Sequence, residues 1–209
     1  MIEIVIIAFI FIMSVIIHEV AHGLAALWLG DPTAKYQGRL TLNPARHIDP
    51  IGSVLVPLIT YLAGGFIFGW AKPVPYNPYN LRDQKYGPAL VGAAGPLANI
   101  LIALVFGFIL RVLLVTGNVS ISDGGLISIV FSYAAMINIL LAFFNLIPIP
   151  PLDGSKLLFA FLPIREETKL QFEQFGLFFL FFVIYILSGP ISLFLRFVQS
   201  AFFRIVVGV

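Results

Sequence analysis

The sequence predicts an all-α polytopic membrane protein with about four to six transmembrane helices, a re-entrant segment and a short β-hairpin-like element after the first helix. Sixty per cent of the 209 residues are hydrophobic and only 11% are charged, and a soluble domain of this size needs more charge on its surface. Several apolar runs also approach or exceed the roughly 20 residues that cross a bilayer core. Cysteine is absent, which excludes disulfides and thiolate metal sites.

The apolar runs divide the chain into expected spans, which together form a single integral-membrane domain over 1–209. The first run ends at Gly30-Asp31-Pro32, a strong helix terminator. It lacks the basic region and cleavage site of a signal peptide, so we expect it to be retained. We expect spans at about 4–29, 88–115, 126–147 and 171–187, a segment at 51–70 that re-enters or spans, and a segment at 190–207 that is amphipathic or spans.

The hairpin-like element is expected in the polar loop at 31–50. There Gln37, Arg39 and Thr41 alternate with small or apolar residues, which is the period of a short strand.

The distribution of lysine and arginine predicts the topology. The loops at 30–50, 71–87 and 148–170 carry three basic residues each, whereas the loop at 116–125 carries none. Re-entry of the segment at 51–70 places all three basic loops on one side of the membrane. We therefore expect the N-terminus outside and the basic loops in the cytoplasm of a prokaryotic cell, at the plasma membrane.

The first apolar run contains "HEVAHG" at 18–23. His18 and His22 are four residues apart, so on a helix they share a face and can reach one zinc ion. Glu19 lies close enough to act as the base for a zinc-bound water. HExxH is short and also occurs by chance. In a membrane, however, each ionisable residue costs about 2.5–3.5 kcal/mol on insertion scales, so packing alone explains three of them poorly.

A catalytic zinc site needs a third protein ligand, and Asp153 is the candidate. It follows Pro148, Pro150 and Pro151, which end a helix and hold an extended segment. Under the expected topology, Asp153 and the HExxH half of the first run lie at similar depth. The alternative is that Asp153 only caps a helix that starts at Ser155.

The chain resembles the site-2 protease family of intramembrane zinc metalloproteases, in its compact prokaryotic form without PDZ or CBS domains. The motifs occur in family order: "HEVAHG" at 18–23, "LTLNPARHIDPIGS" at 40–53, "GWAKPVPYNP" at 69–78, "AAGPLAN" at 93–99 and "FNLIPIPPLDGS" at 144–155. The resemblance implies that His18, His22 and Asp153 bind Zn²⁺ and that Glu19 is the catalytic base. No motif position departs from the family pattern.

Four further polar residues need an interpretation, and for Asn145 two alternatives remain open. Asn145 could donate a hydrogen bond to the scissile carbonyl or its oxyanion, or satisfy carbonyls freed by Pro148. We expect Asn99 to mend the backbone beside Pro96 and Asn138 to bond another helix. We expect His47 to be structural and not a ligand.

Together these observations predict a zinc-dependent intramembrane endopeptidase that hydrolyses peptide bonds within or near transmembrane segments of membrane proteins. Its expected partners are such a substrate and the lipid bilayer, with no nucleic acid, and its active site faces the cytoplasm. An exposed strand edge around Arg39–Leu42 would hold the unwound substrate by main-chain pairing. The alternatives are a non-catalytic scaffold and a metal-handling carrier; the spans hold almost no further ionisable residues, which counts against transport.

Overall fold

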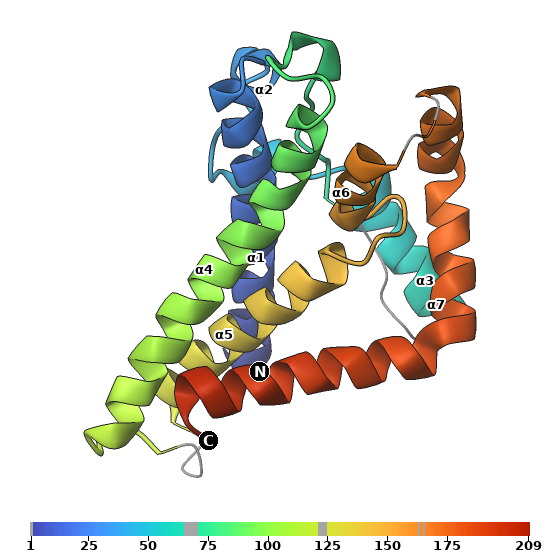
Figure 1. Cartoon of the computed structure of the whole chain (residues 1–209). Helices are drawn as coiled ribbons and strands as arrows, with labels where there is room; N and C mark the ends of the chain where they lie inside the picture. The colour runs from blue at the N-terminus through green and yellow to red at the C-terminus, as the bar shows by residue number, and fades with distance from the viewer. Residues whose placement is uncertain (1, 65–70, 121–124, 163, 165) are drawn as a thin grey trace.

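The computed structural model describes residues 2–64, 71–120, 125–162, 164 and 166–209, and all regular structure within them is helical (Figure 1). The helices are α1 (Ile2–Trp28), α2 (Thr33–Tyr36), α3 (Val56–Gly64), α4 (Gly87–Val115), α5 (Leu126–Asn145), α6 (Asp153–Phe161) and α7 (Glu166–Phe202). Short 3₁₀ or π-helical turns cover Pro44–Arg46, Pro50–Leu55, Pro78–Asn80 and Phe203–Val207.

Four of these helices are long and apolar enough to cross a membrane: Ile2–Trp28, Gly87–Val115, Leu126–Asn145 and Gln174–Val207. Their outward faces are hydrophobic. On α4, Leu97, Leu101 and Phe108 are each at least 60% exposed, and they recur on one helical face. Such a surface is stable only against lipid. The chain is an integral membrane protein.

The centre of the molecule is a bundle of α1, α4 and α5, with the short α6 packed against α4 (Figure 1). Small side chains make the contacts: Ala26, Ala103, Ala135 and Ala142 have no exposed surface. Small residues let helix backbones approach closely in a membrane. The approach brings polar groups of α1, α4 and α5 within hydrogen-bonding distance of one another.

A buried carboxylate organises the loops at the end of α1. Gly30 has φ +112°, and it ends the helix in a left-handed cap in which the Asp31 amide donates to the Ala26 carbonyl at 2.8 Å. Asp31, fully buried, accepts hydrogen bonds from the Thr33 hydroxyl, the Asn80 side chain and the Asn77 amide. Burial alone would raise the pKa of Asp31, but these hydrogen bonds outweigh it and hold the pKa below its usual value.

The expected β-hairpin-like element is not supported. Residues 31–50 are all described, and they form the single turn α2, irregular backbone and a 3₁₀ turn, with no strand. The backbone donors of this loop bond locally; the Arg39 amide, for example, donates to the Ala34 carbonyl at 2.9 Å. The alternating polar residues do not share a face, because Arg39 turns inward, with 5% exposure, whereas Gln37 is exposed.

The two segments of ambiguous topology are helical where they are described. Residues 50–64 form a π-helical turn followed by α3, and the remainder of the expected 51–70 segment lies outside the described residues. Helix α7 bends at Leu187, whose ψ of +20° is not helical, since Pro190 has no N–H for the Ile186 carbonyl. The two halves of α7 therefore run in different directions (Figure 1).

Arg111, in the last turns of α4, closes the far end of the bundle. Its guanidinium donates to the carbonyl oxygens of Ile205 and Val206 at 3.2 and 3.4 Å. These carbonyls belong to the turn that ends the chain and have no helical partner of their own.

Candidate metal centre

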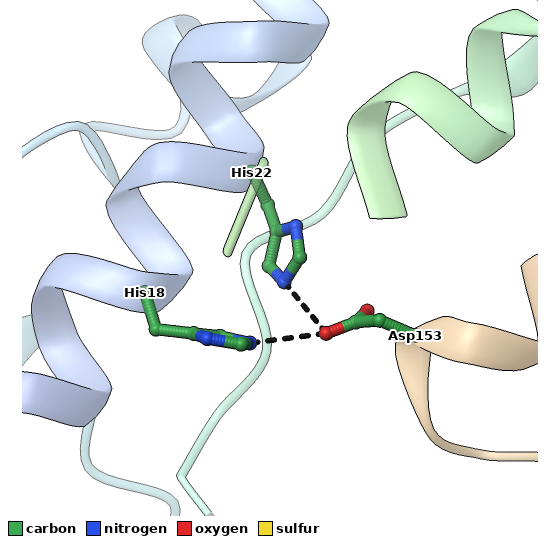
Figure 2. Close-up of side chains that lie close together, drawn as sticks. All are labelled: His18, His22 and Asp153. Carbon is green, nitrogen blue, oxygen red and sulfur yellow. Dashed lines mark hydrogen bonds and ion pairs between the residues drawn. The ribbon is translucent and has the colours of Figure 1, made fainter. Parts of the chain in front are cut away.

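His18 and His22 lie one turn apart on α1 and are both buried. Their rings meet edge to face, with centroids 4.6 Å apart. The four-residue spacing predicts this shared face, because 3.6 residues complete one turn. Figure 2 shows both Nε2 atoms directed away from α1 toward α6.

Asp153, the first residue of α6, completes the cluster (Figure 2). Its Oδ2 lies 3.0 Å from His18 Nε2 and 3.1 Å from His22 Nε2. The turn that delivers it is tight: a Cβ on Gly154 would clash with the backbone of Leu146 and Ile147. Only glycine fits there.

The other carboxylate oxygen of Asp153, Oδ1, forms an ion pair with a lysine. Lys156, one turn later on α6, donates from Nζ to Asp153 Oδ1 at 3.1 Å. The carboxylate therefore presents Oδ2 alone to the histidines.

A chain of hydrogen bonds across three helices assigns the tautomer of His18. The Ser14 hydroxyl donates to the Ile10 carbonyl at 2.7 Å and so must accept from Asn138 Nδ2 at 2.8 Å. Asn138 Oδ1 then accepts from Asn99 Nδ2 at 2.7 Å, which leaves Asn99 Oδ1 facing His18 Nδ1 at 2.6 Å. Because Asn99 Oδ1 can only accept, Nδ1 of His18 carries a proton, and in the neutral imidazole Nε2 is then the bare nitrogen.

The second imidazole is fixed in the same tautomer by the backbone. His22 Nδ1 lies 2.7 Å from the carbonyl oxygen of Val91 on α4, and a carbonyl can only accept. In the neutral imidazole its Nε2 is then bare as well. Metal-ligating histidines are held in this way, with the far nitrogen bonded to a carbonyl or side-chain oxygen.

The cluster fits a zinc ion. Two imidazole nitrogens and one carboxylate oxygen lie within 4.8 Å of one another, and with neutral imidazoles their three electron pairs converge as the ligands of one cation do. Ligands with bonds of about 2.0–2.1 Å in tetrahedral geometry stand roughly 3.3 Å apart, and the observed separations are 3.0 and 3.1 Å. Two histidines and a carboxylate leave a fourth position open, as in catalytic zinc sites.

Gly95 of α4 keeps the space beside the two nitrogens clear. A Cβ at this position would lie 2.5 Å from His22 Nε2 and 2.6 Å from His18 Nε2. Any side chain here would clash with both Nε2 atoms, which are the nitrogens that would hold a metal.

Glu19 is held by the extended segment at 71–77 and not by the histidines. Its Oε2 accepts from the Val74 amide at 2.7 Å. This segment is itself fixed, because Arg39 donates to the carbonyls of Lys72 and Pro73 at 2.6 and 3.1 Å. The glutamate is thus oriented from outside the helix that carries it.

The remaining polar residues of the sequence analysis lie as follows. Asn138 bonds other helices, as expected. Asn99 does not mend the backbone at Pro96; its side chain joins His18 to Asn138. Asn145 Nδ2 donates to Leu141 O at 2.9 Å, and His47 Nε2 bonds Thr41 O at 2.8 Å.

Sequence reasoning therefore missed three contacts of the site: Asn99 with His18, Lys156 with Asp153, and Val74 with Glu19. The available signal was weak. A buried asparagine in an apolar helix indicates some partner without naming it, and nothing in a sequence marks a backbone amide as a donor.

Comparison with known proteins matches this chain to one protein family. The family model described as peptidase family M50 matches residues 6–187. The protein named "Putative zinc metalloprotease YwhC" of Bacillus subtilis is 38% identical over 180 residues, 84% of this chain and 77% of that protein.

More distant relatives carry similar names. "Putative zinc metalloprotease Rip2" of Mycolicibacterium smegmatis is 27% identical over 87% of this chain and 66% of its own length. "Putative zinc metalloprotease MJ0611" of Methanocaldococcus jannaschii is 34% identical over 47% of this chain and 43% of its own length. The search of solved structures gave no significant match.

Proposed function

The chain belongs to peptidase family M50, the site-2 protease family, and from this premise we propose that it is a membrane-embedded zinc endopeptidase that cleaves peptide bonds within or near transmembrane segments of other membrane proteins. Zinc is the cofactor of this family. The observation that carries the proposal is the convergence of His18 Nε2, His22 Nε2 and Asp153 Oδ2 in a chain with four helices long and apolar enough to cross a membrane.

The three side chains are proposed as the metal ligands. Bound there, zinc supplies a Lewis acid that polarises a carbonyl and lowers the pKa of water to about 7. The residues around it keep the ligands in place: Asn99 and the Val91 carbonyl hold the imidazoles, and Lys156 holds the carboxylate. Mutation of such outer contacts typically lowers metal affinity or activity by about 10–100-fold.

Glu19 is proposed as the general base. The Val74 amide holds Oε2 and leaves Oε1 to accept a proton from the attacking water. The water oxygen bonds to the carbonyl carbon, the C–N bond breaks, and Glu19 delivers that proton to the departing amine. Asn145 is proposed to donate to the developing oxyanion, for which it must use its second N–H or release Leu141.

The orientation is proposed from the charge distribution. Three loops with three basic residues each would lie in the cytoplasm of a prokaryotic plasma membrane, against a loop at 116–125 with none. His22 and Asp153 lie toward the loop end of α1, beside residues 71–77, so the active site faces that side. The substrate is a membrane protein or peptide with a transmembrane segment.

Zinc content and cleavage, measured together on the purified wild type and Glu19→Gln, test the proposal. We expect about one zinc per chain in both proteins and cleavage of a membrane-peptide library by the wild type alone. Asp153→Asn should lose zinc as well as cleavage. A folded wild type without zinc would overturn the proposal, and zinc without cleavage of any library member would favour a non-catalytic scaffold.

A further inference from the structure

The two carboxylate oxygens of Asp153 have different partners. Oδ2 lies 3.0 and 3.1 Å from Nε2 of His18 and His22, whereas Oδ1 accepts a hydrogen bond from Nζ of Lys156 at 3.1 Å. The Asp153 side chain is only 9% exposed. A buried carboxylate oxygen needs a partner, because it has lost the water that would otherwise stabilise its charge. In this structure the Lys156 ammonium group is a partner of Oδ1.

Contacts from three elements orient the Lys156 ammonium group. Lys156 lies three residues after Asp153 on α6, so the two side chains share a face of the helix. The stem of the lysine lies against α4 at Gly92, where an added Cβ would stand 3.0 and 3.1 Å from its Cδ and Cβ atoms. Its Nζ lies 5.6 Å from the centre of the Tyr76 ring, within the range of a cation–π contact. The ammonium group is therefore held beside Oδ1 by α6, α4 and the loop that follows residue 71.

The number of oxygens that Asp153 offers decides whether the metal centre is open. A carboxylate can bind a metal ion through one oxygen or through both. With one oxygen, Asp153 and the two imidazoles supply three ligand atoms and leave a fourth tetrahedral position free, as in catalytic zinc sites. With both oxygens, the same three residues supply four ligand atoms. A lysine ammonium group has only donors and is no metal ligand, so its hydrogen bond to Oδ1 competes with a second bond from Asp153 to the metal.

We propose that Lys156 is a positioning residue that keeps Asp153 a one-oxygen ligand and thereby keeps the fourth position of the metal centre open. The inference rests on the proposed function and adds to it the number of ligand atoms that the protein supplies. A hydrogen bond that involves charged groups is roughly twice as strong as a neutral one, so the ammonium group competes well for Oδ1. Without it, Oδ1 has the metal ion beside it as a partner, and the carboxylate turns to bind through both oxygens.

Infrared spectroscopy of the Asp153 carboxylate tests the proposal. The antisymmetric and symmetric stretching bands of a carboxylate lie further apart when one oxygen binds a metal ion than when both do. The full-length protein is labelled with ¹³C at the aspartate carboxyl groups, which separates Asp153 from Glu19, and spectra are recorded without metal and with Zn²⁺. We expect the zinc-dependent bands of the wild type to be widely separated. Lys156→Met, which keeps the length of the side chain and loses the ammonium group, should narrow the separation while zinc, by elemental analysis, stays bound.

A matched variant separates the contact with Asp153 from the general effect of a positive charge. Lys85→Met makes the same substitution at an exposed position of the neighbouring loop, where Nζ lies 4.9 Å from the centre of the Tyr86 ring. It should keep the band separation of the wild type. Lys156→Gln, which is neutral and one atom shorter than lysine, takes the place of Lys156→Met if that variant does not fold.

The outcomes distinguish this proposal from the proposed function. A narrow band separation in the wild type, or equal separations in the wild type and Lys156→Met with zinc bound to both, would overturn the role of Lys156 and leave the metal centre in place. Loss of zinc from folded Lys156→Met would overturn it too, because the lysine would then be needed to retain the metal and not to limit its ligands. A wild type without zinc-dependent aspartate bands would overturn the metal centre itself.

Discussion

The Oδ1 atom of Asn99 lies 2.6 Å from Nδ1 of His18, and this contact joins the metal centre to a buried polar chain across the bundle. The chain ends at a backbone carbonyl, that of Ile10, so its direction is fixed: each side chain donates toward Ile10, and Asn99 can offer His18 only an oxygen. Three helices thus cooperate to place a proton on Nδ1 of His18, which leaves Nε2 as the ligand atom of the neutral imidazole.

Removal of the Asn99 side chain should weaken zinc binding. Asn99→Ala deprives His18 of the acceptor that fixes its tautomer and ring orientation. The expected loss of zinc affinity is about 10–100-fold, measured by competition with a chelator on the folded, purified protein. Asn138→Ala removes the next link and leaves Asn99 free to rotate, so its loss should be smaller. Equal affinity in Asn99→Ala and the wild type would show that the contact with Asn99 has no part in holding the metal.

The backbone amide of Val74 should affect turnover without affecting zinc. Val74→Pro deletes the N–H that holds Glu19, between prolines at 73 and 75 where the chain is already extended. A misplaced base costs on the order of 100-fold in rate, so kcat should fall while zinc content stays at about one per chain. Val74→Ala is the matched control, because it keeps the N–H and loses only the side chain packed near Gly23. A similar kcat in both variants would argue against a role for the amide.

The histidine pair was predictable because its geometry is local: a spacing of four residues fixes one helical face. The contact of Asn99 with His18 was not, since it depends on how α1, α4 and α5 are rotated about their axes. The strand expected around Arg39–Leu42 was wrong for a related reason. The alternation of polar and apolar residues does not correspond to two faces here, because Arg39 turns in to bond the carbonyls of Lys72 and Pro73 and the next residue, Leu40, packs beside Gly23.

Substitution of Gly95 should abolish zinc binding while sparing the fold. In Gly95→Ala the new methyl carbon would lie within 2.6 Å of both ligating nitrogens, so the imidazoles must rotate out of position. We expect zinc content to fall well below one per chain, by elemental analysis, with the helical content unchanged by circular dichroism. Gly189→Ala, with nothing within 4 Å of the added carbon, should keep its zinc. Full zinc occupancy in Gly95→Ala would mean that the metal is held elsewhere.

Asp31 should stabilise the fold in a way that disappears at acid pH. The hydrogen bonds from Thr33, Asn80 and Asn77 outweigh the opposing effect of burial and lower the pKa of Asp31 in the folded protein. A depressed folded pKa contributes stability above the unfolded value of about 3.9 and loses it as the pH falls through the folded pKa.

The test compares the thermal stability of the wild type and Asp31→Asn between pH 7 and pH 3. Hydrogen bonds to a charged group are worth about 1.5–3 kcal/mol, so the variant should melt at a lower temperature, by a margin that is constant from pH 7 to about pH 5. Below about pH 4 the margin should shrink, because Asp31 of the unfolded wild type takes up a proton that the hydrogen-bonded carboxylate of the folded protein takes up only at lower pH. Asp83→Asn is a suitable control: its Oδ1 also accepts backbone amides, those of Lys85 and Tyr86, but at an exposed site, where water replaces the lost contacts. A margin for Asp31→Asn that persists unchanged to pH 3 would show that the shape of the side chain, and not its charge, holds the loops together.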